Sequence, residues 1–250
     1  MRWWLVLITL IASTVTPRAE EIIAGLSTDR FEITSNFVGG SLVVFGTINR
    51  DAQTIARAGK YDVAIVVTGP RSDITTRRKA RVLGIWVNRE AARFENAPLY
   101  YATLASNPLE EIAPAASKER FGIGTASMPL EVGGFEPNAA SFREALIRLK
   151  ASDALYFDDV SAVSFLSDTL FTANIALPAI VPIGDFTVDI YAFRDGALIG
   201  QTSEAFRVQK TGFEQFMFNL AHNQPLLYGI IAVLLAIFTG WAAGVIFRRD

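Results

Sequence analysis

Three basic residues at alternate positions form the most distinctive chemical pattern in this sequence. The stretch TTRRKARVLGIWVNRE contains Arg77, Lys79 and Arg81, which share one face of a β-strand at a spacing of about 7 Å. The three positive charges repel one another unless acidic side chains or a bound anion offset them. Two interpretations stay open: a docking surface for anionic lipid, an anionic solute or an acidic partner, or an edge strand that charge protects from aggregation. Trp86 is interpreted as a core or rim residue.

Other candidates for catalysis are weak. Asp158 and Asp159 are adjacent, and neighbours on an extended segment point apart, so they make a poor acid and base pair. The GIGTAS stretch at residues 122–127 lacks the third glycine of a phosphate-binding turn. No Gly-x-Ser-x-Gly or Ser-x-x-Lys motif occurs. We therefore expect no catalytic site.

The cysteine and histidine counts restrict cofactor chemistry further. The chain has 0 cysteines, which excludes disulfides, thiol nucleophiles and iron–sulfur ligation. The single histidine, His222, argues against zinc and copper sites built on imidazole, and it is interpreted as solvated or capping. We expect no metal and no cofactor. The net charge is −2, whereas nucleic-acid-binding domains are usually strongly basic, so we expect no nucleic-acid partner.

The elements that position these residues are mainly β. Runs of strand length and composition are SLVVFGTI, DVAIVVTG, RVLGIWVN, LYYATLAS, FTANIALP, FTVDIYAF and EAFRVQ. Two alternating runs flank Asp195-Gly196, a strong hairpin signal. We expect an immunoglobulin-like β-sandwich over residues 20–212. Of 23 basic and 25 acidic residues, four basic and two acidic lie outside this range, which leaves the body at −4.

An α-helical insertion is expected at about residues 107–159. SFREALIRLKASDALYF has helical spacing at Phe142, Leu146 and Leu149, and Asn138 or Ser141 could cap the helix. A second small domain is the alternative.

Both ends of the sequence suggest membrane targeting. Residues 1–19 place Arg2 before an apolar stretch of about 15 Å as a helix, which predicts a signal peptide; an uncleaved anchor is the alternative because Pro17 suits cleavage poorly. Residues 225–247 predict a transmembrane helix, since Leu226 to Phe247 carries no charge. Arg248 and Arg249 then place the tail, residues 248–250, in the cytoplasm.

The body is therefore expected in the periplasm, anchored to a bacterial inner membrane. The sequence lacks the Asn-x-Ser/Thr acceptor of eukaryotic glycosylation, which agrees with a bacterial setting. Between body and span, residues 213–224 predict an amphipathic interfacial elbow, whose apolar stripe is Phe213, Phe216, Met217 and Leu220.

One face of the transmembrane helix is expected to carry small residues. At 100° per residue, six of them project within about 60° of one direction: Gly229, Ala232, Ala236, Gly240, Ala243 and Gly244. Small residues four apart let helices approach closely in lipid, so this face predicts helix packing. The alternative is that glycine and alanine are simply common in membrane helices.

Several stretches carry a family resemblance. RRKARVLGIWVN (Arg77 to Asn88), FENAPLYYATLASNPL and the segment from Leu170 to Gly196 resemble the alphaproteobacterial putative transmembrane protein family. GIWVN and LPAIVPIG are the most specific parts, and the similarity covers nearly the whole mature chain. The resemblance implies a signal peptide, a periplasmic domain and one C-terminal span. It also implies association with permeases similar to sulfite exporters of the TauE/SafE type, and it defines no catalytic residues.

These observations favour a non-catalytic accessory subunit. Its single helix would pack against a multi-span permease, or against a second copy, within the lipid bilayer. A periplasmic module that binds an anion or lipid headgroup through Arg77, Lys79 and Arg81 is the first alternative. An enzyme that uses carboxylates is the second.

Overall fold

The computed structural model describes residues 21–34, 36–49, 60–134 and 136–246. The expected signal peptide at 1–19, Phe247 and the tail at 248–250 lie outside these residues. The strands are β1 (Glu21–Leu26), β2 (Arg30–Ile33), β3 (Gly39–Asn49), β4 (Asp62–Thr68), β5 (Arg71–Val82), β6 (Ile85–Pro98), β7 (Tyr101–Ala105), β8 (Glu131–Val132), β9 (Tyr156–Val160), β10 (Val163–Phe165), β11 (Leu170–Pro178), β12 (Gly184–Arg194) and β13 (Ala197–Lys210). The helices are α1 (Leu109–Ile112), α2 (Ala115–Phe121), α3 (Ala139–Ser152), α4 (Phe213–Asn223) and α5 (Pro225–Ile246).

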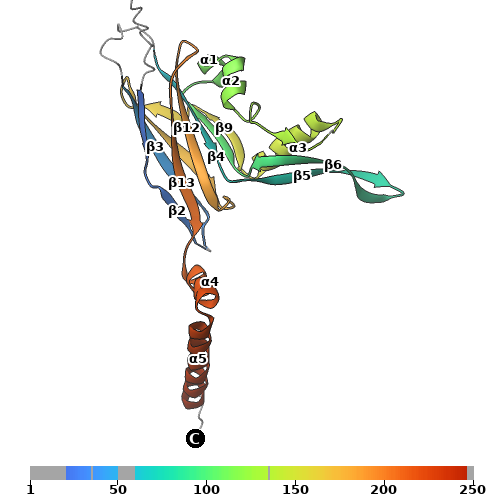
Figure 1. The fold of residues 1–250 in the computed structure, drawn as a ribbon, viewed down its shortest axis with the longest axis vertical. Coiled ribbons are helices and arrows are strands. Elements are labelled where there is room, and N and C mark those ends of the chain that lie inside the picture. The colour runs from blue at the N-terminus through green and yellow to red at the C-terminus, as the bar shows by residue number, and fades with distance from the viewer. Residues whose placement is uncertain (1–20, 35, 50–59, 135, 247–250) are drawn as a thin grey trace, which may run out of the picture.

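Two sheets pack face to face and enclose the core (Figure 1). The first has the order β1-β3-β11-β10 and the second β2-β13-β12-β4-β7-β9. Alternate residues of β3 and β12 are buried between the sheets, as the period of two requires. The Tyr100 hydroxyl, which donates to the Ala176 carbonyl at 2.7 Å, links the sheets. The body is therefore mainly β, as the sequence predicts, and the immunoglobulin-like assignment stays a prediction.

The central strands β4 and β7 are buried on both faces. All five residues of β7 are buried, and so are Val63 to Val67 of β4. One face lies against the first sheet, and the other is covered by residues around α1, where Leu109 and Ile112 are buried. This explains why both strands read as continuous apolar runs. The three helices α1, α2 and α3 all lie between β7 and β9, within the segment expected to be helical.

Helix α3 confirms the expected helix but corrects one residue of its apolar stripe. Phe142 and Leu146 are buried, whereas Leu149 is 56% exposed. Helix α3 packs on β5, β6 and β9, and the exposure of Leu149 shows that its side chain lies outside this packed face. Asn138 occupies the N-cap position, but its side chain makes no capping hydrogen bond.

Strands β5 and β6 form a long hairpin that leaves the body sideways (Figure 1). We call residues 77–90 of this hairpin the arm. The run RVLGIWVN, predicted as one strand, is the end of this hairpin: Val82 pairs with Ile85 around a turn. Leu83 and Gly84 both have positive φ, 50° and 88°, as a two-residue turn of this kind requires. The single-strand prediction was therefore wrong.

Below the body, α4 leads into α5 (Figure 1). The apolar stripe expected on α4 rests partly on Phe213 and Phe216, whose side chains are not described. Helix α5 contains a candidate span, Pro225–Val245, with a mean hydropathy of 2.2, and none of it is buried against the rest of the chain. Its length and composition match a membrane-crossing helix.

Candidate functional site

The basic row lies where the sequence places it, on one face of the arm. Arg77, Lys79 and Arg81 alternate along β5 and are all exposed. Within the described part of the chain, their side chains make no hydrogen bond or ion pair. β5 is also the outer strand of the sheet β5-β6-β8. The geometry is therefore compatible with both interpretations of the row, docking and edge protection.

The intervening Arg78 behaves differently because it points to the other face of the strand. Its guanidinium lies 5.0 Å from the centre of the Phe142 ring and donates to Ser141 at 2.7 Å and Glu90 at 3.1 Å. These contacts fasten the base of the arm to α3. Arg77, Lys79 and Arg81 therefore extend away from the body on strand β5, and Arg78 of the same strand is fixed by its contacts with α3.

Trp86 corrects the sequence interpretation. It is 69% exposed at the end of the arm, beside Leu83, which is fully exposed, so it is neither core nor rim. Sequence reasoning missed this exposed apolar end because it treated the run as one strand. The signal that could have found it is Leu83-Gly84 in the middle of an otherwise strand-like run.

Two motifs that the sequence treats separately come together in the structure. Gly122 ends α2 in the left-handed conformation, with φ of 65°, so GIGTAS is a helix-ending turn. The Asp158 carboxylate accepts hydrogen bonds from the Thr125 amide at 2.9 Å and the Thr125 hydroxyl at 2.6 Å. The Gly124 amide donates to the Thr103 hydroxyl at 3.1 Å. These hydrogen bonds connect the helical segment to β9 and β7, and we interpret them as stabilising the fold.

The Asp158 anchor gives a stability prediction with a built-in control. Asp158→Ala removes the acceptor of both Thr125 bonds and is expected to lower the free energy of unfolding by about 1 kcal/mol, because the site is exposed. Asp159→Ala is expected to change it by less than about 0.5 kcal/mol. Chemical denaturation of the full-length protein in detergent measures both. Equal effects would contradict the assignment.

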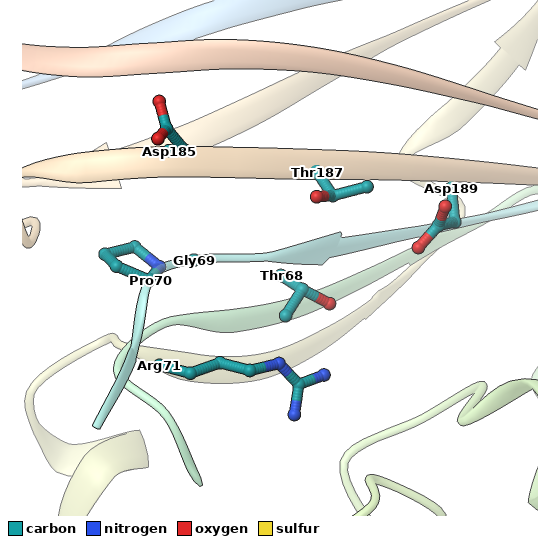
Figure 2. A pocket seen from close by; sticks show the side chains of 7 residues that line it. All are labelled: Thr68, Gly69, Pro70, Arg71, Asp185, Thr187 and Asp189. Carbon is teal, nitrogen blue, oxygen red and sulfur yellow. The ribbon is translucent and has the colours of Figure 1, made fainter. Parts of the chain in front are cut away.

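A shallow polar hollow of about 360 Å³ lies on the outer face of β4 and β12. Its lining is Thr68, Gly69, Pro70, Arg71, Asp185, Thr187 and Asp189. Figure 2 shows Thr68, Asp189 and Arg71 turned toward a common space, with Asp185 at the far end of the row. The groups that converge there are one guanidinium, one carboxylate and hydroxyls.

The charged groups of this hollow are already engaged. Asp185 accepts two hydrogen bonds from Arg207, at 2.5 and 3.1 Å, and this contact lowers the pKa of the carboxyl group. Asp189 accepts from Ser203 at 2.7 Å, and Arg71 donates to the Asn96 carbonyl at 3.2 Å. Among the described residues of the hollow, these contacts leave no activated nucleophile.

The six small residues of α5 all lie on exposed helix surface: Gly229, Ala232, Ala236, Gly240, Ala243 and Gly244. Apart from neighbouring residues and the backbone of α5 itself, nothing in the described chain lies within 4 Å of a Cβ added at any of the three glycines. On an ideal helix Val233 also projects within about 40° of this direction, so the smooth part of the face runs from Ala236 to Gly244. This segment can admit another helix at short distance.

Comparison with known proteins gives one result. The family model described as "Putative transmembrane protein (Alph_Pro_TM)" matches residues 21–249. No curated protein matches the chain, and no solved structure matches it. The matched range contains both the β body and the apolar C-terminal helix. The chain belongs to this family of alphaproteobacterial transmembrane proteins.

Proposed function

We propose that this protein is a non-catalytic, membrane-anchored accessory subunit whose single helix packs against a helix of a partner membrane protein. The observation that carries the proposal is the smooth face of α5 from Ala236 to Gly244, which has no neighbour in the described chain. In lipid, close backbone approach at small residues is a main source of helix association.

The partner proposed is a multi-span permease, of the kind similar to sulfite exporters of the TauE/SafE type. This part rests on the family resemblance of the Arg77–Asn88 and Leu170–Gly196 segments. A mainly β body attached to one apolar helix suits an accessory subunit, in which the partner forms the transport pathway and this protein contacts it from the side and from outside the membrane.

Co-purification tests the proposal directly. The tagged full-length protein is extracted from its native membrane in a mild detergent, and the proteins that elute with it are identified by mass spectrometry. A multi-span permease recovered in fixed ratio supports the proposal. Recovery of the chain alone, after chemical cross-linking in the membrane as well, would overturn it.

Topology gives a separate prediction. We propose a periplasmic body and a cytoplasmic C-terminus, because Arg248 and Arg249 follow the span directly. A reporter enzyme that is active only in the periplasm is expected to work when fused after Gly212 and to be inactive when fused after Asp250. The reverse pattern would contradict this orientation.

A further inference from the structure

The end of the arm is an exposed apolar surface surrounded by positive charge. Val82, Leu83, Ile85 and Trp86 are 39%, 101%, 65% and 69% exposed, and we call these four residues the arm tip. Residues 77–90 contain five basic residues and one acidic residue, a net charge of +4. The whole body, residues 20–212, carries −4, so the rest of the body carries −8. The arm is therefore positively charged, whereas the rest of the body is negatively charged.

A second exposed apolar surface lies on the outer face of the sheet β1-β3-β11-β10. Ile23, Phe45 and Leu170 are 54%, 48% and 39% exposed. Ile23 and Leu170 both pair with Thr47, one from each side, and Phe45 lies over Gly25. The three positions are neighbours around Thr47 on one face of the sheet, and we call Ile23, Phe45 and Leu170 the sheet patch. Outward positions of a sandwich sheet are ordinarily polar, so this patch is unusual.

Within the described residues, the strands that carry the sheet patch have no basic side chain. The four strands of its sheet contain one charged residue, Glu21. Asp168 lies in the short connection between β10 and β11, close in sequence to Leu170. An apolar surface with a cationic border can therefore meet an apolar surface with an acidic border without placing like charges together.

The two surfaces lie on opposite sides of the body. Figure 1 shows the arm leaving one side, with β1 and β3 on the other and α5 below both. Copies that α5 anchors in one membrane stand parallel, with their bodies at the same level. With α5 along the membrane normal, the arm tip lies beside the body and away from the bilayer that α5 crosses.

We propose that the arm tip of one copy docks on the sheet patch of a second copy in the same membrane. The contact is head to tail, so it generates a ring or a row of copies and not a two-fold dimer. Four side chains are few beside the roughly 20–30 residues that each partner contributes to a stable interface. The contact therefore depends on the shared membrane, which concentrates the copies and keeps them parallel.

Site-specific cross-linking tests the proposal, because the natural chain has 0 cysteines. Two differently tagged full-length chains, one with Leu83→Cys and one with Phe45→Cys, are expressed together and oxidised in their membrane. Disulfide formation between the two chains is expected. In the control pair, Phe45→Cys is replaced by Gln201→Cys, on the exposed outer face of β13, and the yield is expected to fall several-fold. Equal yields, or no product from either pair, would overturn the proposal.

The positive charge of the arm is tested in the same assay. Arg77→Glu, Lys79→Glu and Arg81→Glu together leave the arm tip intact but reverse the charge beside it. Because these side chains make no described bond, the fold is expected to survive, which circular dichroism checks. The cross-link between Leu83→Cys and Phe45→Cys is expected to fall several-fold. An unchanged yield with an intact fold would contradict the role of charge complementarity in the docking.

A last measurement separates a second copy from the lipid surface. Leu83→Cys in the full-length chain is labelled with an environment-sensitive fluorophore and reconstituted into phosphatidylglycerol-containing vesicles. If the arm tip docks on another copy, the fluorophore is expected to emit at shorter wavelength, as in an apolar environment, when the protein is dense in the membrane. When added lipid dilutes the protein, the emission is expected to shift back to the value measured in water. Emission that stays blue-shifted on dilution would show that the arm tip inserts into lipid. Aqueous emission at every protein-to-lipid ratio would show that the arm tip stays in solvent. Either result would overturn the proposal.

Discussion

Replacing Gly240 and Gly244 by Leu is expected to separate the protein from its membrane partner while leaving it in the membrane. The substituted helix stays apolar and long enough to insert. Two isobutyl groups would, however, stand where the backbone of another helix is proposed to approach, and close packing is the main attraction between helices in lipid. We expect the co-purified partner to fall to roughly a tenth or less, which corresponds to ~1.4 kcal/mol of lost association.

The matched control is Ala242→Leu, which projects to the far side of the same helix at 100° per residue. It adds the same kind of side chain to the same span, so insertion and expression should be comparable. Retention of the partner by the control, with loss in the glycine variant, supports a packing face. If both variants retain the partner, α5 is only an anchor, and the association must be sought in the body or at α4.

Phe142→Ala is expected to produce the largest loss of stability among the variants considered. Phe142 is 2% exposed and packs between α3 and the base of the arm, where Arg78 lies over its ring. Truncation leaves a cavity and removes this contact, which costs about 3–5 kcal/mol for a buried phenylalanine. Chemical denaturation of the full-length protein in detergent, followed by circular dichroism, measures the change.

Leu149→Ala, on the same helix, is the control for Phe142→Ala. The sequence places Leu149 on the same stripe, but the structure leaves it 56% exposed. Its truncation is expected to change the free energy of unfolding by less than about 0.5 kcal/mol. A large effect of Leu149→Ala together with a small effect of Phe142→Ala would contradict the packing of α3 described here.

Features that depend only on neighbouring residues could be predicted from the amino-acid sequence. Alternation of apolar residues located β3 and β12, because a strand exposes successive side chains to opposite faces. Asp195-Gly196 located the turn between β12 and β13, because both residues tolerate positive φ, here 50° and 77°. The length and hydropathy of residues 225–247 identified the candidate span, since the thickness of a bilayer sets a simple threshold.

Which of these local patterns become buried depends on the packing of distant segments and could not be predicted from local sequence. The run RVLGIWVN has strand composition throughout, and composition does not show that its apolar residues lack a core to enter. Phe45 reads as part of an apolar strand, yet its face of the sheet is uncovered.

Contacts between distant segments were likewise beyond local pattern. Asp158 meets Thr125 across 33 positions of sequence, and no periodicity in either segment indicates that meeting. The same holds for the opposite placement of arm and sheet patch. Burial is a property of what packs on a residue from elsewhere in the chain, so spacing predicts which residues share a face, and the fold decides whether that face is covered.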